Sequence, residues 1–239
     1  KEAALLVLLK DDLGDMVNAI AMGRRIYTNL KKAIQYIISI HIPIILTVFI
    51  PLVLWWSYPN IFSPVHVIFF ELIMGPTCSI IYENEPMEKD TMAQPPRPFS
   101  TTFFNWNELA TSVLQGLMIT VGTLSAYQYA VFHGSDEATT RTMVFVTLIT
   151  ANIVLTLVNR SFHYSILTTL KYRNNLVPLI IMITVALTGL LLFVSPLTRF
   201  FEFEILNFNQ ILISVGIGII SVIWYEGVKC WKRLREQSE

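Results

Sequence analysis

Long apolar runs separated by short polar segments dominate the chain. Six of these runs are long enough to cross about 30 Å of hydrocarbon as α-helices. They cover residues 33–56, 64–82, 109–132, 142–159, 176–194 and 205–225. The pattern predicts an all-α, multi-pass membrane protein with six transmembrane helices.

The segment ahead of the first apolar run has a different, amphipathic pattern. Apolar residues recur at intervals of three and four from Met16 onward, and no proline occurs between Met16 and Ile42. This favours one helix that forms a cytoplasmic stalk over residues 16–32 and continues into the membrane. At about 1.5 Å per residue, residues 16–56 would extend roughly 60 Å, twice the hydrocarbon thickness. Two helices with a bend near Gly23 are the alternative.

The remaining segments complete the predicted domain organisation. Residues 5–9 form a short apolar run that predicts a buried strand without a partner, followed by a polar turn. We therefore expect residues 1–15 to be the end of a soluble α/β domain of a longer protein, truncated here. Residues 33–228 form the six-helix membrane domain, and residues 229–239 form a basic cytoplasmic tail.

Charge bounds the function and sets the orientation. Hydrophobic residues make up 54% of the chain and the formal net charge is zero, so nothing favours binding of nucleic acid. Of the 17 Lys and Arg residues, only Arg141 and Arg199 fall in segments that alternate to the outer side. The excess of positive charge on the inner side predicts that both ends are cytoplasmic. The longest inner segment, residues 83–107, is a proline-rich connector.

The second apolar run carries the strongest candidate for chemistry. Glu71 lies inside it, four residues before Gly75-Pro76. A charged group in hydrocarbon is costly, which makes Glu71 a candidate functional residue and the expected metal ligand. Pro76 lacks the N–H that would bond the carbonyl of Leu72, so we expect a helix break. The carbonyls of Leu72, Gly75 and Pro76, with the hydroxyl of Thr77, would then supply oxygen ligands to a cation. The alternative is a proline kink with Glu71 hydrogen-bonded to neighbouring helices.

Three further polar residues lie within predicted spans. His41 precedes Pro43 by two residues, and Pro43 would free the carbonyl of Ser39 as another ligand. His41 would bind the cation, carry protons or hydrogen-bond Glu71, unless it is only a packing residue. Asn152 either completes the cation site or hydrogen-bonds another helix. Gln115 is expected to join helices through hydrogen bonds.

Three motifs together resemble the P-type cation-transporting ATPases of type II, the branch that includes calcium pumps. They are the stalk Gly23-Arg24-Arg25-Ile26-Tyr27-Thr28-Asn29-Leu30-Lys31-Lys32, the span segment from Glu71 to Ser79, and the connector with Glu85-Pro86-Met87-Glu88 and Pro95-Pro96-Arg97. The resemblance covers essentially the whole chain and implies helices five to ten of a ten-helix pump, with residues 1–15 as the end of its phosphorylation domain. It also implies that Arg24, Arg25, Tyr27, Lys31 and Lys32 couple the stalk to the membrane domain.

The resemblance implies an enzyme whose other parts lie outside this chain. The full-length protein would be a translocase that couples ATP hydrolysis, with Mg2+, to cation transport through an aspartate phosphorylated in a soluble domain. Its partners would be the lipid bilayer and its own N-terminal half, which contains helices one to four and the actuator, nucleotide-binding and phosphorylation domains. A bacterial inner membrane is the expected location.

The sequence departs from the family pattern at the ligand positions. The positions that correspond to side-chain ligands in calcium-pump relatives hold His41 and Ile44 in the first span, and Glu71, Met74 and Gly75 in the second. Calcium sites draw on several oxygens, so one carboxylate beside a histidine fits a single-cation or proton site better. Two alternatives stay open: a pump relative that no longer transports, and an ion-coupled secondary transporter or channel. The absence of visible repeats and the stalk-first entry argue against the second alternative.

Overall fold

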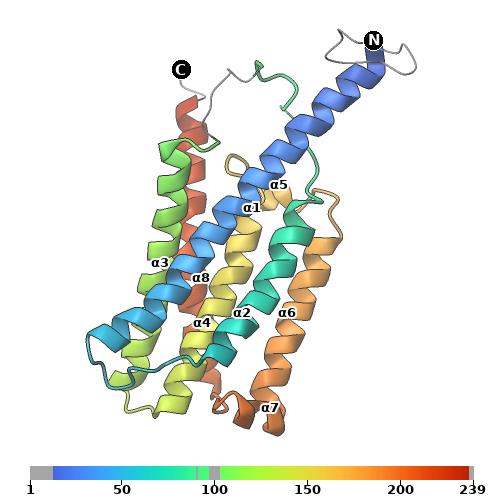
Figure 1. Ribbon diagram of the computed structural model, residues 1–239. Coiled ribbons are helices and arrows are strands. Elements are labelled where there is room, and N and C mark those ends of the chain that lie inside the picture. Colours follow the sequence, from blue (N-terminus) through green and yellow to red (C-terminus); the bar gives the residue numbers. More distant parts are fainter. Residues whose placement is uncertain (1–12, 90, 97–102, 237–239) are drawn as a thin grey trace, which may run out of the picture.

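Helices form all the regular structure in the part of the chain that the computed structural model describes, residues 13–89, 91–96 and 103–236 (Figure 1). The predicted strand at residues 5–9 lies outside these residues and stays a prediction. Six helical segments are long and apolar enough to cross a membrane, as the apolar runs predicted. The protein is therefore an all-α, multi-pass membrane protein.

The first helix, α1, runs without interruption from Leu13 to Val53, although Pro43 and Pro51 lie inside it. Its 41 residues correspond to about 60 Å at 1.5 Å per residue. Figure 1 shows its N-terminal part rising above the rest of the bundle. The single stalk-and-span helix is confirmed, and the alternative of two helices divided near Gly23 is wrong.

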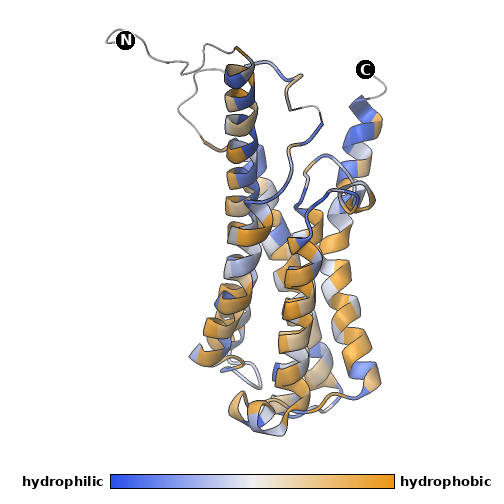
Figure 2. Cartoon of the chain, turned by 90° about the vertical axis from the view of Figure 1, so that its right-hand side faces the viewer, coloured by the Kyte–Doolittle hydropathy of each residue, from blue (hydrophilic) through white to orange (hydrophobic). Residues whose placement is uncertain are grey.

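The other spans follow in sequence order. The second span consists of α2 (Pro64–Pro76) and η1 (Thr77–Tyr82), and it is followed by α3 (Trp106–Phe132), α4 (Glu137–Val158), α6 (Leu176–Phe193) and α8 (Phe208–Glu236). Two short helices, α5 (Ile166–Thr169) and α7 (Ser195–Phe200), were not predicted. Helix α8 continues well past the predicted end at residue 225, so the first part of the basic tail is helical. Figure 2 shows hydrophobic residues along the spans and hydrophilic residues gathered at the stalk end.

Local sequence signals explain where several helices begin. Asp136 precedes α4, and its carboxylate accepts a hydrogen bond from the backbone N–H of Thr139 at 2.9 Å. Asn105 precedes α3, and its own N–H donates to the Glu108 carboxylate at 2.9 Å. Pro64 is the first residue of α2, where its missing N–H costs no helical hydrogen bond.

Helices α1 and α3 approach each other closely at a glycine. A Cβ built on Gly116 of α3 would lie 2.8 Å from the Cβ of Ile42 and 2.9 Å from the carbonyl oxygen of Ser39, both on α1. Only glycine fits at this distance, and small residues at such contacts are a general feature of helix packing in membranes. The contact fixes α1 against the bundle one residue away from His41.

Candidate cation site

The structure brings His41 of α1 and Glu71 of α2 into direct contact. Their Nε2 and Oε1 atoms are 2.9 Å apart. The other ring nitrogen of His41, Nδ1, lies 2.8 Å from the carbonyl oxygen of Ile37. A carbonyl only accepts hydrogen bonds, so Nδ1 carries a proton. Of the roles considered for His41, a hydrogen bond to Glu71 is the one that this geometry shows.

A hydrogen bond between Nε2 and Oε1 requires a proton on one of these two atoms. With Nδ1 protonated, either an imidazolium faces a carboxylate or a neutral imidazole accepts from a carboxylic acid. Removal of that proton leaves a nitrogen lone pair and a carboxylate directed at the same point. Such a pair can bind a proton or a cation, but not both at once.

The pair lies on a lateral face of the bundle that no described residue covers. The side chains of His41 and Glu71 are 40% and 51% exposed. Large apolar side chains surround them on the same two helices and are also exposed, among them Ile45, Ile68 and Leu72. Ionisable groups within a membrane normally face protein or water rather than lipid, so this face is a candidate site.

Thr77 and Asn152 lie elsewhere, around a small cavity between η1, α4 and α6. Thr156 and Thr184 also line this cavity, which has a volume of about 10 Å3 and is about large enough for one water molecule. The carbonyl oxygen of the Asn152 side chain accepts a hydrogen bond from the hydroxyl of Tyr36 on α1. Of the two interpretations of Asn152, the hydrogen bond to another helix is therefore present. The structure does not place Thr77 or Asn152 beside Glu71.

The predicted break at Gly75-Pro76 takes a different form. Helix α2 continues through Pro76 and passes directly into η1, a π-helix, so the second span stays helical. A π-helix changes the hydrogen-bonding register, which lets the chain absorb the missing N–H of Pro76 without unwinding. The expectation of an open break in the helix at Gly75-Pro76 is therefore corrected, whereas the carbonyls of Leu72, Gly75 and Pro76 as cation ligands stay a prediction. The carbonyl of Ser39, which lies four residues before Pro43, is in close contact with Gly116 of α3.

The predicted stalk residues contact the connector and the start of α3. Arg24 donates to the carbonyls of Thr91 and Gln94, each at 2.8 Å, and Tyr27 donates to the carbonyl of Phe103 at 3.0 Å. Arg25 donates to the backbone carbonyl of Glu85, while Lys31 and Lys32 form ion pairs with Glu108 and Glu88. A cavity of about 690 Å3 lies beside Arg24, Lys31 and Lys32, remote from Glu71.

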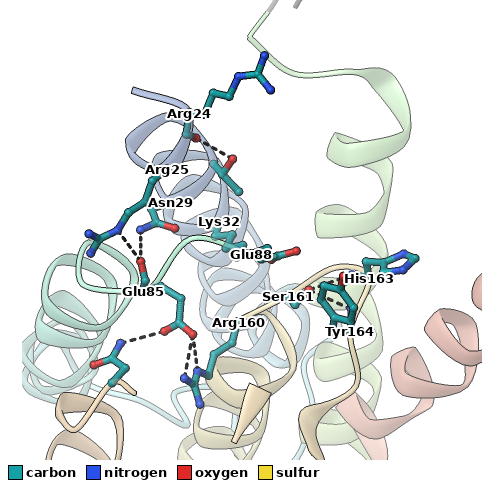
Figure 3. A network of polar contacts seen from close by, with 12 residues as sticks. Arg24, Arg25, Asn29, Lys32, Glu85, Glu88, Arg160, Ser161, His163 and Tyr164 are labelled. Carbon is teal, nitrogen blue, oxygen red and sulfur yellow. Dashed lines mark hydrogen bonds and ion pairs between the residues drawn. The ribbon is translucent and has the colours of Figure 1, made fainter. Parts of the chain in front are cut away.

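Sequence reasoning missed a buried polar network at the stalk end, drawn in Figure 3. It joins Asn29 of the stalk, Glu85 of the connector, Arg160 after α4 and Asn174 before α6. The signal available in the sequence was weak: charged residues directly after apolar runs are common at membrane surfaces. Their pairing across 75 positions is visible only in three dimensions.

Comparison with known proteins identifies the family. Residues 59–231 match the family model described as "Cation transporting ATPase, C-terminus". The chain belongs to this family. The matched residues include the second span and the connector motifs, and the resemblance to cation-transporting ATPases is thereby confirmed.

Similar proteins are described as calcium pumps. The chain is 28% identical over 247 residues to "Calcium-transporting ATPase 1" of Lactococcus lactis, and 24% identical over 238 residues to human "Calcium-transporting ATPase type 2C member 1". It is 24% identical over 229 residues to "Calcium-transporting ATPase lmo0841" of Listeria monocytogenes. These alignments cover 99%, 99% and 96% of the chain but 26% of each relative. The chain thus spans about a quarter of the length of these relatives.

Proposed function

We propose that this cation-transporting ATPase region forms the membrane part of an ATP-driven pump and binds a single cation or a proton at Glu71 and His41. The observation that carries the proposal is the 2.9 Å contact between Glu71 Oε1 and His41 Nε2 on an uncovered intramembrane face. A carboxylate beside an imidazole can bind a proton or a cation, and this is the chemistry that a transport site requires.

The surroundings of the pair support a site of low coordination number. Ile44 and Met74, at positions where the family resemblance expects ligands, are buried apolar residues of the core. Within the described ranges, no three His, Cys, Asp or Glu side chains are grouped so that they would hold a metal ion. A calcium ion takes six to eight oxygen ligands, far more than this face offers.

The proposed full-length protein supplies the remaining parts. Its other transmembrane helices would cover the exposed face of α1 and α2 and complete the site. ATP and Mg2+ would bind in its soluble domains, which supply the phosphorylated aspartate. In this proposal the carbonyls of Ser39, Leu72, Gly75 and Pro76, with Thr77 and Asn152, serve as auxiliary groups reached by movement of the helices. Arg24, Arg25, Tyr27, Lys31 and Lys32 transmit movement of the stalk. Both ends face the cytoplasm of a bacterial cell.

A non-transporting relative is the second candidate, and the apolar side chains at Ile44 and Met74 are what favour it. Phosphorylation separates the two candidates. A transporting pump forms its phosphoenzyme only when the transported ion occupies its site, whereas a non-transporting relative lacks that dependence. A secondary transporter would form no phosphoenzyme.

The test is phosphoenzyme formation from ATP in the complete protein, measured across a panel of cations and a range of pH. We expect one cation, or a step in pH, to control phosphorylation, and Glu71→Gln to remove that control. Glu204→Gln, which changes an exposed carboxylate beyond the opposite end of the spans, serves as the control and should behave as the unmodified protein. If phosphorylation of the unmodified protein and of Glu71→Gln is the same at every cation and pH, the proposed site is refuted.

A further inference from the structure

The side chain of Glu85 is completely buried and held from two sides (Figure 3). Its Oε1 atom accepts a hydrogen bond from Arg160 Nε at 2.9 Å and lies 2.8 Å from Arg160 Nη2 in an ion pair. Its Oε2 atom accepts from Asn174 Nδ2 at 2.9 Å. Arg160 is itself only 2% exposed. Both oxygens of one buried carboxylate are therefore committed to fixed partners.

These partners come from separate parts of the chain. Glu85 follows the end of η1 by three residues, Arg160 follows the end of α4 by two, and Asn174 precedes α6 by two. The three residues thus tie the stalk ends of the second span, α4 and α6 together. The backbone carbonyl of Glu85 adds the stalk to this group, because it accepts from Arg25 Nε at 2.9 Å and Asn29 Nδ2 at 2.8 Å.

Asn174 also holds the π-helix directly. Its Nδ2 group donates to the carbonyl of Ile81, inside η1, at 3.1 Å, in addition to Glu85. A π-turn holds one residue more than an α-turn, and reversion of η1 to α-helix would rotate α2 by about 100° and shift it by about 1.5 Å. A rotation of that size would carry Glu71 away from His41.

The burial of the Glu85 and Arg160 charges requires a physical explanation. Two ions removed from water are costly, and apolar residues of similar volume often stabilise a protein as well or better. In some proteins, buried polar and ionic groups fix the register between the elements that they join. Here the element next to the ion pair is the π-helix between Glu85 and Glu71.

We propose that Glu85, held by Arg160 and Asn174, is a positioning residue for the cation site: it fixes the register of η1, and so the rotation of α2 that brings Glu71 to His41. None of these three residues touches the cation. The consequence for transport rests on the proposed function, but the positioning of Glu71 is a geometric effect that can be measured without ATP or cation.

The geometric test is a cross-link between positions 41 and 71 in the complete protein. His41→Cys and Glu71→Cys are combined in a background whose other cysteines, Cys78 and Cys230 among them, are serine. A bifunctional methanethiosulfonate with a one-carbon spacer is the probe, and the yield is read by mass spectrometry. Yields are compared in otherwise unmodified protein and in Glu85→Asp, which keeps the charge but shortens the reach by about 1.5 Å.

Glu226→Asp is the matched control. Glu226 pairs with the buried Lys229 at 2.6 Å, and Lys229 donates to the last carbonyl of α4, so this pair also joins elements at the stalk end. Among the described residues, neither Glu226 nor Lys229 forms a hydrogen bond or ion pair with the second span. We expect Glu85→Asp to lower the cross-linking yield about tenfold, and Glu226→Asp to leave it unchanged within about twofold, at melting temperatures that show both variants to be folded.

An unchanged yield in folded Glu85→Asp would overturn the proposal. If Glu85→Asp does not fold, the double variant Glu85→Gln with Arg160→Gln takes its place, because it leaves no unpaired buried charge. A reduced cross-linking yield in this variant supports the proposal, and an unchanged yield overturns it. In the phosphorylation assay, Glu85→Asp should raise the cation concentration for half-maximal phosphorylation about tenfold. If the unmodified protein shows no cation dependence, the proposed function fails, while the cross-link still decides the positioning role.

Discussion

The close contact between α1 and α3 at Gly116 allows a quantitative prediction for Gly116→Ala. The added methyl group would lie 2.8 Å from the Cβ of Ile42 and 2.9 Å from the carbonyl oxygen of Ser39. Both atoms belong to or adjoin the backbone of α1, so neither can swing aside as the end of a flexible side chain would. The helices must separate by several tenths of an ångström to admit the methyl group.

Two effects set the magnitude. Alanine favours a helix interior over glycine by about 1 kcal/mol. Overpacking of a close contact costs about 1–3 kcal/mol. Gly216→Ala isolates the first effect, because Gly216 lies in α8 and a Cβ there would meet no atom within 4 Å. The free energy of unfolding of Gly116→Ala should therefore lie about 1–3 kcal/mol below that of Gly216→Ala.

The assay is reversible unfolding of the purified protein in mixed micelles, titrated with SDS, for the unmodified protein and both variants. Gly216→Ala should match or exceed the unmodified protein in stability, and Gly116→Ala should fall below Gly216→Ala by the stated amount. Equal stabilisation by the two substitutions would show that α1 and α3 do not meet at Gly116, and the placement of α1 beside α3 would then be wrong.

Two further predictions concern single hydrogen bonds. Tyr36→Phe removes the hydroxyl that donates to buried Asn152, and should lower the unfolding free energy by about 0.5–2 kcal/mol in the same assay; an unchanged value would show that this bond is not formed. The hydrogen bond from Thr139 lowers the pKa of Asp136 below its ordinary value of 3.8. The carboxylate therefore stabilises α4 above about pH 4, and its contribution is lost as pH falls through the lowered pKa. Asp136→Ala should cost about 1 kcal/mol at neutral pH and remove that acid-dependent part of the stability. An acid-dependent loss that is as large in Asp136→Ala as in the unmodified protein would contradict this.

Much of the fold could be predicted because membrane spans obey a simple length and polarity rule. Residues 33–56 and the five later apolar runs were expected to be helical, since a helix satisfies every backbone hydrogen bond within one segment and these runs have its length and continuous apolarity. The absence of proline from Met16 to Ile42 predicted the continuous stalk. The end of α8 at Glu236 was missed because its last turns are basic, and charge marks where a span leaves the membrane rather than where the helix ends.

The candidate site was predictable only in part. An intramembrane Glu71 and His41 were visible as unusual residues, and their contact was one of several possibilities. Pro76 indicated that one helical hydrogen bond would be lost, but not that the chain would continue as a π-helix. The π-helix depends on how Ile81 and Glu85 are held by residues outside η1. The pairing of Glu85 with Arg160 could not be predicted from the residues near either one. It depends on the second span and α4 ending at the same level of the bundle.

Transport by the complete protein, reconstituted in vesicles, tests the central claim most directly. ATP-driven uptake of the cation that controls phosphorylation, or acidification if pH controls it, is compared between the unmodified protein and Glu71→Gln. The account predicts uptake by the unmodified protein and none by Glu71→Gln at equal protein content. Uptake by Glu71→Gln at the unmodified rate would contradict it, because the transported ion would then pass through the membrane without the His41–Glu71 pair.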